Sequence, residues 1–219
     1  MLDFEVHIGL AVDPDAPVVA AIPNAWKREP VLKLLSLEDD REYERHNVEG
    51  DLRTLMTRHA RTLDEVKELV VEAAGHANSE RSSRIEVEQV LVSCGRELAI
   101  PESGEFSFNL SPDTFPRLEM IPETPPYEVH YCLAWDRPED AVTVREVAAI
   151  CAKSNIGIDE IVHFGDDKIT TTKFYETLDA MMEELASDAE IFLAALDASC
   201  TNLRFRLIAE RIITCGIPL

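Results

Sequence analysis

The chain of 219 residues is long enough to bury one large core or two smaller ones. Its 42 acidic and 21 basic side chains give a formal net charge of −21, which disfavours binding to nucleic acid or to an anionic membrane surface. The same charge suits a well-solvated surface or a basic protein partner.

The first half of the chain begins with an alternation of apolar and polar residues over 4–10, which predicts a half-buried strand. Two prolines restrict the next helix to a short segment over 18–22. The charged residues 38–49 are expected to form an excursion loop. Thr62 opens a T-L-D-E capping box, and the helix that it begins is expected to end near Gly75.

A proline-rich segment divides the chain. Residues 99–126 hold six of the twelve prolines and predict a linker between a domain over 1–98 and a second domain over 127–219. Within the linker, alternating apolar residues at 106, 108 and 110 predict an extended strand.

The second half predicts the order strand, helix, strand, strand, helix, strand. A turn is expected at Gly165, and Thr177 is expected to cap the second helix. The expected elements are strands over 127–135, 158–164, 168–175 and 203–214, and helices over 144–153 and 177–198.

The two halves repeat one another in sequence. The stretches FEVHIGLAVD, which begins at Phe4, and YEVHYCLAWD, which begins at Tyr127, share six of ten residues. Two more blocks recur in the same order: Gly50-Asp51, Thr57-Arg58 and Thr62–Asp64 match Gly165-Asp166, Thr172-Lys173 and Thr177–Asp179, and Val92–Gly95 matches Ile213–Gly216. Collinear blocks indicate an internal duplication. We therefore predict an α+β fold: a tandem duplication of ferredoxin-like βαββαβ (split βαβ) domains, with antiparallel sheets and helices on one face.

Targeting and redox signals are sparse. The N-terminus shows no secretory signal and no apolar run is long enough to span a membrane, which predicts a cytoplasmic protein. The cysteines are widely spaced without a C-x-x-C motif, which favours reduced thiols over a disulfide framework or a zinc site. They are Cys94, Cys132, Cys151, Cys200 and Cys215. No metal and no cofactor are predicted.

The predicted sheets each expose one polar face. The apolar residues of the first strand must face the helices, so His7 and His130 point to the opposite face, with Glu5 and Glu128 beside them. The last strand of each half carries two like charges at alternate positions, which point to the same face of the sheet. They are Glu86 and Glu88 in the first half and Arg204 and Arg206 in the second. The first open face is therefore expected to be acidic and the second basic.

Two interpretations of these faces stay open. In the structural one, the Glu and Arg pairs fix the register of the two domains and the histidines are satisfied interface residues. In the functional one, the faces line a cleft in which Arg204, Arg206, Arg58 or Lys173 binds an anion. His7 and His130 would then act as an acid–base pair on a phosphate ester.

The histidine tetrapeptides, His7-Ile-Gly-Leu10 and His130-Tyr-Cys-Leu133, resemble those of the two-histidine phosphoesterases, which are also duplicated α+β domains. The resemblance implies phosphoester hydrolysis by the two histidines. Glycine and cysteine stand where that family carries its phosphate-binding hydroxyl.

Because no strong catalytic motif is present, the first functional expectation is an acidic, non-catalytic accessory or regulatory protein that binds a protein partner, possibly a basic one. The alternatives are binding of a small anionic metabolite or nucleotide between the repeats, or hydrolysis of the phosphoesterase type. Whether the chain is an enzyme stays open at this point.

Overall fold

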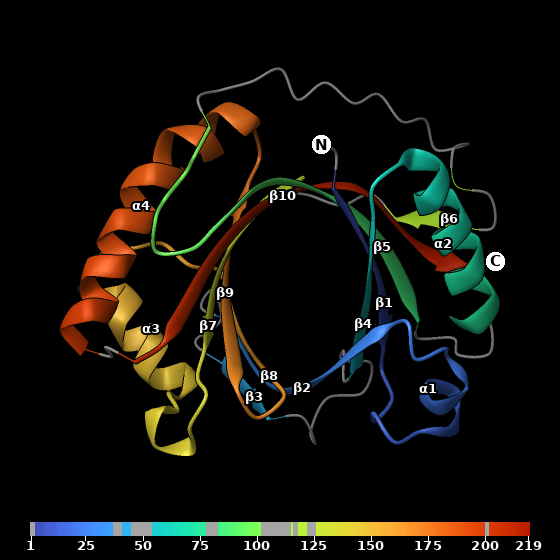
Figure 1. Ribbon diagram of the computed structural model, residues 1–219, viewed down its shortest axis with the longest axis horizontal. Coiled ribbons are helices and arrows are strands. Elements are labelled where there is room, and N and C mark those ends of the chain that lie inside the picture. The colour runs from blue at the N-terminus through green and yellow to red at the C-terminus, as the bar shows by residue number, and fades with distance from the viewer. Residues whose placement is uncertain are drawn as a thin grey trace.

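The strands pair in an unbroken circuit that returns to its starting point (Figure 1). The computed structural model describes residues 3–36, 41–44, 54–77, 83–101, 115, 118–121, 126–199 and 202–219. Neighbouring strands follow the order β2-β4-β1-β5-β10-β7-β9-β8, and β8 pairs back to β2. The eight strands are β1 (Phe4–Leu10), β2 (Lys27–Ser36), β4 (Thr54–Ala60), β5 (Arg84–Cys94), β7 (Tyr127–Ala134), β8 (Glu160–Phe164), β9 (Lys168–Tyr175) and β10 (Arg204–Pro218). They form a closed antiparallel β-barrel.

This closure corrects the predicted fold. Two tandem ferredoxin-like α+β domains with open sheets were expected, but the sheets of the two halves are continuous with one another. The first half contributes β2-β4-β1-β5 and the second contributes β8-β9-β7-β10. Strands β5 and β10 join them along one seam, and β2 and β8 along the other. A closed barrel leaves no exposed edge for the eight strands, whereas each open sheet would have left two.

Strand β2 makes the second seam because it changes partners part-way along. Its first residues, 27–30, pair with β4, and residues 31–36 pair with β8. The change occurs at Pro30, whose carbonyl oxygen accepts a hydrogen bond of 2.8 Å from the Gly165 N–H, in the turn after β8. Proline cannot donate to a ladder, so it suits this point of transfer. An ion pair of 2.9 Å between Glu29 on β2 and Lys168 on β9 also crosses the seam.

Two short strands extend the barrel wall. Strand β3 (Arg41–Glu44) pairs with β2, so this part of the predicted loop over 38–49 is a strand and the rest of it lies outside the described residues. Strand β6 (Leu118–Ile121) lies in the predicted linker and pairs with the end of β10. The strand expected at 106–110 also lies outside the described residues.

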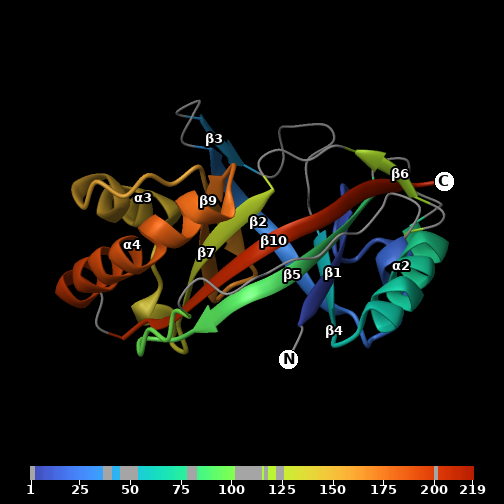
Figure 2. The same cartoon turned by 90° about the horizontal axis from the view of Figure 1, so that it is seen from above.

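The helices cover the outside of the barrel on two opposite sides (Figures 1 and 2). They are α1 (Pro17–Ala21), α2 (Leu63–Ala77), α3 (Val144–Lys153) and α4 (Leu178–Ser199), with a short 3₁₀ helix over Pro138–Asp140. One core packs α1 and α2 against the outward side chains of β1, β4 and β5, and another packs α3 and α4 against those of β7, β9 and β10. The apolar side chains of β1 and β7 thus face the helices, as their alternation predicted.

Local hydrogen bonds explain where the helices begin. The Thr62 hydroxyl accepts a hydrogen bond of 3.2 Å from the Glu65 N–H, and the Thr177 hydroxyl accepts one of 3.2 Å from the Ala180 N–H, so both predicted caps are confirmed. Helix α3 begins with a full capping box between Thr143 and Glu146, which was not predicted. Among the described residues, no helix has both the length and the apolar composition needed to cross a membrane.

The two repeated Cys-Gly pairs have different surroundings, which predicts different responses to mutation. A methyl group on Gly216 would lie 2.9 Å from the Glu119 carbonyl oxygen, whereas one on Gly95 would lie 3.7 Å from its nearest neighbour, the Phe205 carbonyl oxygen. We expect Gly216→Ala to lower the free energy of unfolding by about 1–3 kcal/mol because β6 must shift. Gly95→Ala should be neutral or slightly stabilising. Urea unfolding of both variants tests this, and equal effects would show that β6 does not pack on β10 as described.

Candidate functional site

The barrel contains a cavity with both charged and apolar side chains on its wall, which we call the lumen. It has a volume of about 940 Å³ and its wall includes residues from both halves of the chain. Side chains alternate along a strand, so the positions between the outward apolar residues must point inward. Eight strands leave an interior that is either filled by side chains or able to hold one small ligand.

Acidic side chains outnumber basic ones on the lumen wall. Its carboxylic side chains are Glu5, Glu29, Glu86, Glu88, Glu128, Asp159, Glu160, Glu176 and Glu210, and its lysines and arginines are Lys27, Arg84, Lys168 and Arg206. The basic residues pair with a few of these acids: Lys27 and Lys168 both contact Glu29, and Arg84 contacts Glu86 at 3.2 Å. Four of the remaining acids, Glu5, Glu88, Glu128 and Glu210, contact the two repeated histidines.

The second-half cluster consists of Glu128, His130, Thr172 and Glu210. The Nδ1 atom of His130 lies 2.9 Å from the Thr172 hydroxyl oxygen. Its Nε2 atom lies 3.5 Å from a Glu128 oxygen and 3.4 Å from a Glu210 oxygen. Strand β7 lies between β9 and β10, so His130 is opposite Thr172 on one side while Glu128 is opposite Glu210 on the other.

The first-half cluster, Glu5, His7, Thr57 and Glu88, repeats this arrangement. His7 Nδ1 lies 2.9 Å from the Thr57 hydroxyl oxygen, and its Nε2 lies 2.9 Å from a Glu88 oxygen and 3.5 Å from a Glu5 oxygen. The pairing is the same as well, because His7 is opposite Thr57 on β4 and Glu5 is opposite Glu88 on β5. Glu5 also contacts His59 at 3.3 Å.

The two clusters meet where Glu88 of the first-half cluster interacts with Glu128 of the second-half cluster. Burial, together with the charge of Glu128, holds the pKa of Glu88 well above its usual range. Burial would also raise the pKa of Glu128, but the charge of His130 lowers it. These opposite directions describe two carboxyl groups that share one proton, held mainly by Glu88. At the centre of the lumen four carboxyl groups contact three histidines, and protons rather than cations offset part of their negative charge.

Glu210 differs from every other member of the clusters in its hydrogen bonding. Glu210 is only 3% exposed, and its Oε1 atom is buried without a hydrogen-bond partner in the described part of the chain. Burial and the charge of Glu88 hold the pKa of Glu210 well above its usual range. A buried oxygen without a partner loses its water without replacement, so this position is costly for the folded protein.

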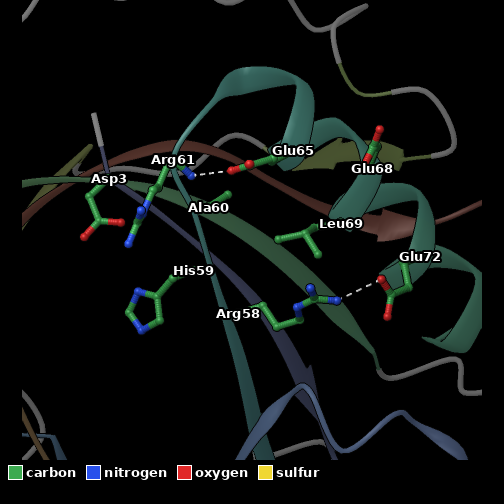
Figure 3. Close-up of a pocket in the computed structure, with 9 residues that line it drawn as sticks. All are labelled: Asp3, Arg58, His59, Ala60, Arg61, Glu65, Glu68, Leu69 and Glu72. Atoms are coloured by element: carbon green, nitrogen blue, oxygen red, sulfur yellow. Dashed lines mark hydrogen bonds and ion pairs between the residues drawn. The ribbon is translucent and has the colours of Figure 1, made fainter. Parts of the chain in front are cut away.

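The cations predicted to bind an anion do not surround the histidines. Arg58 lies outside the barrel, where its guanidinium contacts Glu72 of α2 at 3.1 Å in a separate surface pocket (Figure 3). Lys173 also points outward, to Glu184 and Asp188 of α4. Arg204 pairs with Asp136 at 3.0 Å and is not part of the lumen wall.

Five of the predicted site residues lie on the lumen wall: His7, Glu86, Glu88, His130 and Arg206. Arg206 donates to the Ser93 hydroxyl from two nitrogens, at 2.9 and 3.1 Å. The expectation of one acidic and one basic face does not describe the wall, because each histidine contacts two acids from its own half, His7 in the first and His130 in the second.

Five members of the clusters were not among the predicted site residues. Glu5 and Glu128 were expected only to lie beside the histidines, and Glu210, Thr57 and Thr172 were missed. Glu210 has the same parity as Arg206 on β10, so alternation alone could have placed it on the inner wall. Thr57 and Thr172 recur in the repeated blocks, and their sequence match was the available signal. Their contact with the histidines depends on strand pairing, which the sequence does not display.

The chemistry of the lumen favours cations. Carboxylates and imidazole nitrogens are ligands for metal ions, and a surplus of carboxylates attracts organic cations as well. A phosphate near His7 or His130 would meet carboxylates on both sides. The positions at which the phosphoesterases carry a hydroxyl are Gly9 and Cys132, and the Thr170 hydroxyl donates to the Cys132 sulfur at 3.6 Å.

The clusters predict that the metal-free protein becomes less stable as pH rises. Burial would lower the pKa of His130, but Glu128 and Glu210 raise it to about 9. A histidine in an unfolded chain has a pKa of about 6.5, so the stabilisation is complete below pH 6.5 and is lost as pH rises through about 9. The raised pKa values of Glu88 and Glu210 act in the same direction.

We expect the free energy of unfolding to fall by up to about 3 kcal/mol across this window, measured by urea unfolding of the metal-free protein. His130→Gln should flatten the dependence. A stability that rises between pH 6.5 and 9 would contradict the arrangement of charges described above.

The chain matches no protein-family model, and no curated protein matches it.

Proposed function

We propose that this protein binds a small cation in the lumen of its barrel. The observation that carries the proposal is the concentration of carboxylates around His7 and His130, which exceeds the cations available to neutralise them. Glu88 and Glu210 lower this cost by holding protons, as the directions of their pKa shifts indicate. A bound cation would replace those protons and relieve the repulsion.

The positions of the basic side chains argue against the anionic ligand that the sequence suggested. Arg58 and Lys173 are engaged outside the barrel, and Arg204 is absent from the lumen wall. An anion in the lumen would have to approach the carboxylates, with Arg206, Lys27, Arg84 and Lys168 as the available lysine and arginine side chains. Because three of these four already contact acids, the balance favours a cation.

A protein partner, an accessory role and a cytoplasmic location were expected from composition. They stay predictions, because they concern the outer surface and the cell rather than the lumen. The cation proposal does not depend on them.

The proposal is tested by the thermal unfolding of metal-free protein with added probes at constant ionic strength. Zn²⁺, Ca²⁺ and spermidine are the cationic probes, and inorganic phosphate is the anionic one. A ligand that binds only the folded state raises the unfolding midpoint. We expect at least one cation to raise it in a saturable manner and phosphate to leave it unchanged.

Matched variants locate the effect. Glu128→Gln removes a buried carboxylate from the lumen, and Glu68→Gln makes the same change on the exposed outer face of α2. The shift caused by the cation should shrink in Glu128→Gln and persist in Glu68→Gln. Stabilisation by phosphate alone, or by no probe, would overturn the proposal.

A further inference from the structure

The second-half cluster places three ligand atoms at the spacing of a metal site. One atom each from Glu128, His130 and Glu210 lie within 4.8 Å of one another. The two separations from His130 Nε2, 3.5 and 3.4 Å, are longer than ordinary hydrogen bonds. Two ligands that each lie about 2.1 Å from a tetrahedral ion are separated by about 3.4 Å. The spacing therefore suits ligands of one ion better than partners of one another.

The unpartnered oxygen of Glu210 is an independent observation at the same position. Oε1 is buried without a hydrogen-bond partner among the described residues, while Oε2 faces His130 Nε2. A cation bound to this carboxylate would compensate the water that burial removed. Hydrogen bonding within the described protein gives no such compensation.

Thr172 orients the histidine for this role. In cationic His130 both ring nitrogens carry protons. When a metal ion displaces the Nε2 proton, the hydrogen bond of 2.9 Å from Nδ1–H to the Thr172 hydroxyl oxygen keeps the Nε2 lone pair directed toward Glu128 and Glu210. Metal-binding histidines in proteins commonly donate their other ring N–H in this way, which fixes both the tautomer and the ring orientation. Thr172 is therefore a positioning residue rather than a ligand.

We propose that Glu128, His130 and Glu210 bind one divalent first-row transition-metal ion, such as Zn²⁺ or Co²⁺. This inference rests on the proposed cation binding and names the class of cation. One imidazole nitrogen with two carboxylates suits these ions, whereas Ca²⁺ and Mg²⁺ prefer oxygen ligands alone. Three protein ligands leave a further coordination position, which the lumen makes accessible to water or a small ligand.

The first-half cluster has the same residue types but a different geometry. His7 Nε2 forms a hydrogen bond of 2.9 Å with Glu88, and the second oxygen of Glu5 contacts His59. Its carboxylates are thus already engaged with histidines. We therefore expect one metal ion per chain, bound in the second half.

The test is calorimetric titration of the metal-free full-length protein with Zn²⁺. Expected results are one Zn²⁺ per chain and an affinity lowered at least about tenfold by His130→Gln, a loss typical of a removed ligand or its support. His7→Gln should have a smaller effect, and His76→Gln, on the outer helix α2, should have none. Equal losses in His7→Gln and His130→Gln, or a stoichiometry of two, would overturn the assignment to the second half.

A spectroscopic readout distinguishes a ligand from a residue that only supports the fold. Co²⁺ bound at His130 Nε2 should give a paramagnetically shifted, exchangeable N–H proton signal from Nδ1, absent in His130→Gln and broadened by faster exchange in Thr172→Val. If His130→Gln does not fold, Glu210→Gln replaces it in the titration and should also weaken Zn²⁺ binding. No shifted signal from folded, Co²⁺-loaded protein would overturn the proposal.

Failure of this inference can be separated from failure of the proposed function. Binding of Ca²⁺ or spermidine that depends on Glu128, with Zn²⁺ no tighter and His130→Gln without effect, would retain a cation-binding lumen and reject the transition-metal site. Binding of no cation would reject both.

Discussion

The pairing of β2 with β8 is the interaction on which the rest of the structure depends. Without it, the sheet would be a long curved ribbon with two free edges and its polar face open to solvent. With it, every barrel strand has a neighbour on both sides, and the polar faces of the two halves enclose one space. Pro30 marks the point at which β2 leaves β4 for β8. Closure thus converts two surfaces into a lumen.

Enclosure changes the energetics of the inner side chains. On an open sheet, Glu88, Glu128 and Glu210 would be hydrated and charged. Inside the barrel they are nearly buried, and their mutual repulsion is strong because water screens it poorly. A proton held mainly by Glu88 reduces the repulsion between Glu88 and Glu128. The neighbouring carboxylates also raise the pKa of His130, which makes that histidine cationic. The apolar cores lie outside the barrel, so the lumen is not required for hydrophobic packing.

The two clusters share residue types but differ in how far their groups satisfy one another. In the first half, a short contact between His7 and Glu88 and the contact from His59 engage the carboxylates. In the second half, His130 lies farther from both of its carboxylates, and one oxygen of Glu210 has no partner in the described chain. Similar sequences can therefore have different roles when a neighbouring residue such as His59 is present in only one copy.

The sequence by itself determined many of the local elements and the face on which each histidine lies. Alternation in β1 and β7 placed His7 and His130 opposite the helices, and the Thr62 and Thr177 caps marked two helix starts, because these patterns depend on neighbours along the chain. Only the tertiary structure decided that the halves close into one barrel, since closure depends on β2, which carries Pro30 and shows no clean alternation. It also decided which charges meet: Arg58 and Lys173 were separated from the histidines, and Thr57, Thr172 and Glu210 were brought to them. Contacts of this kind depend on the register of strands far apart in the chain, which composition and spacing do not encode.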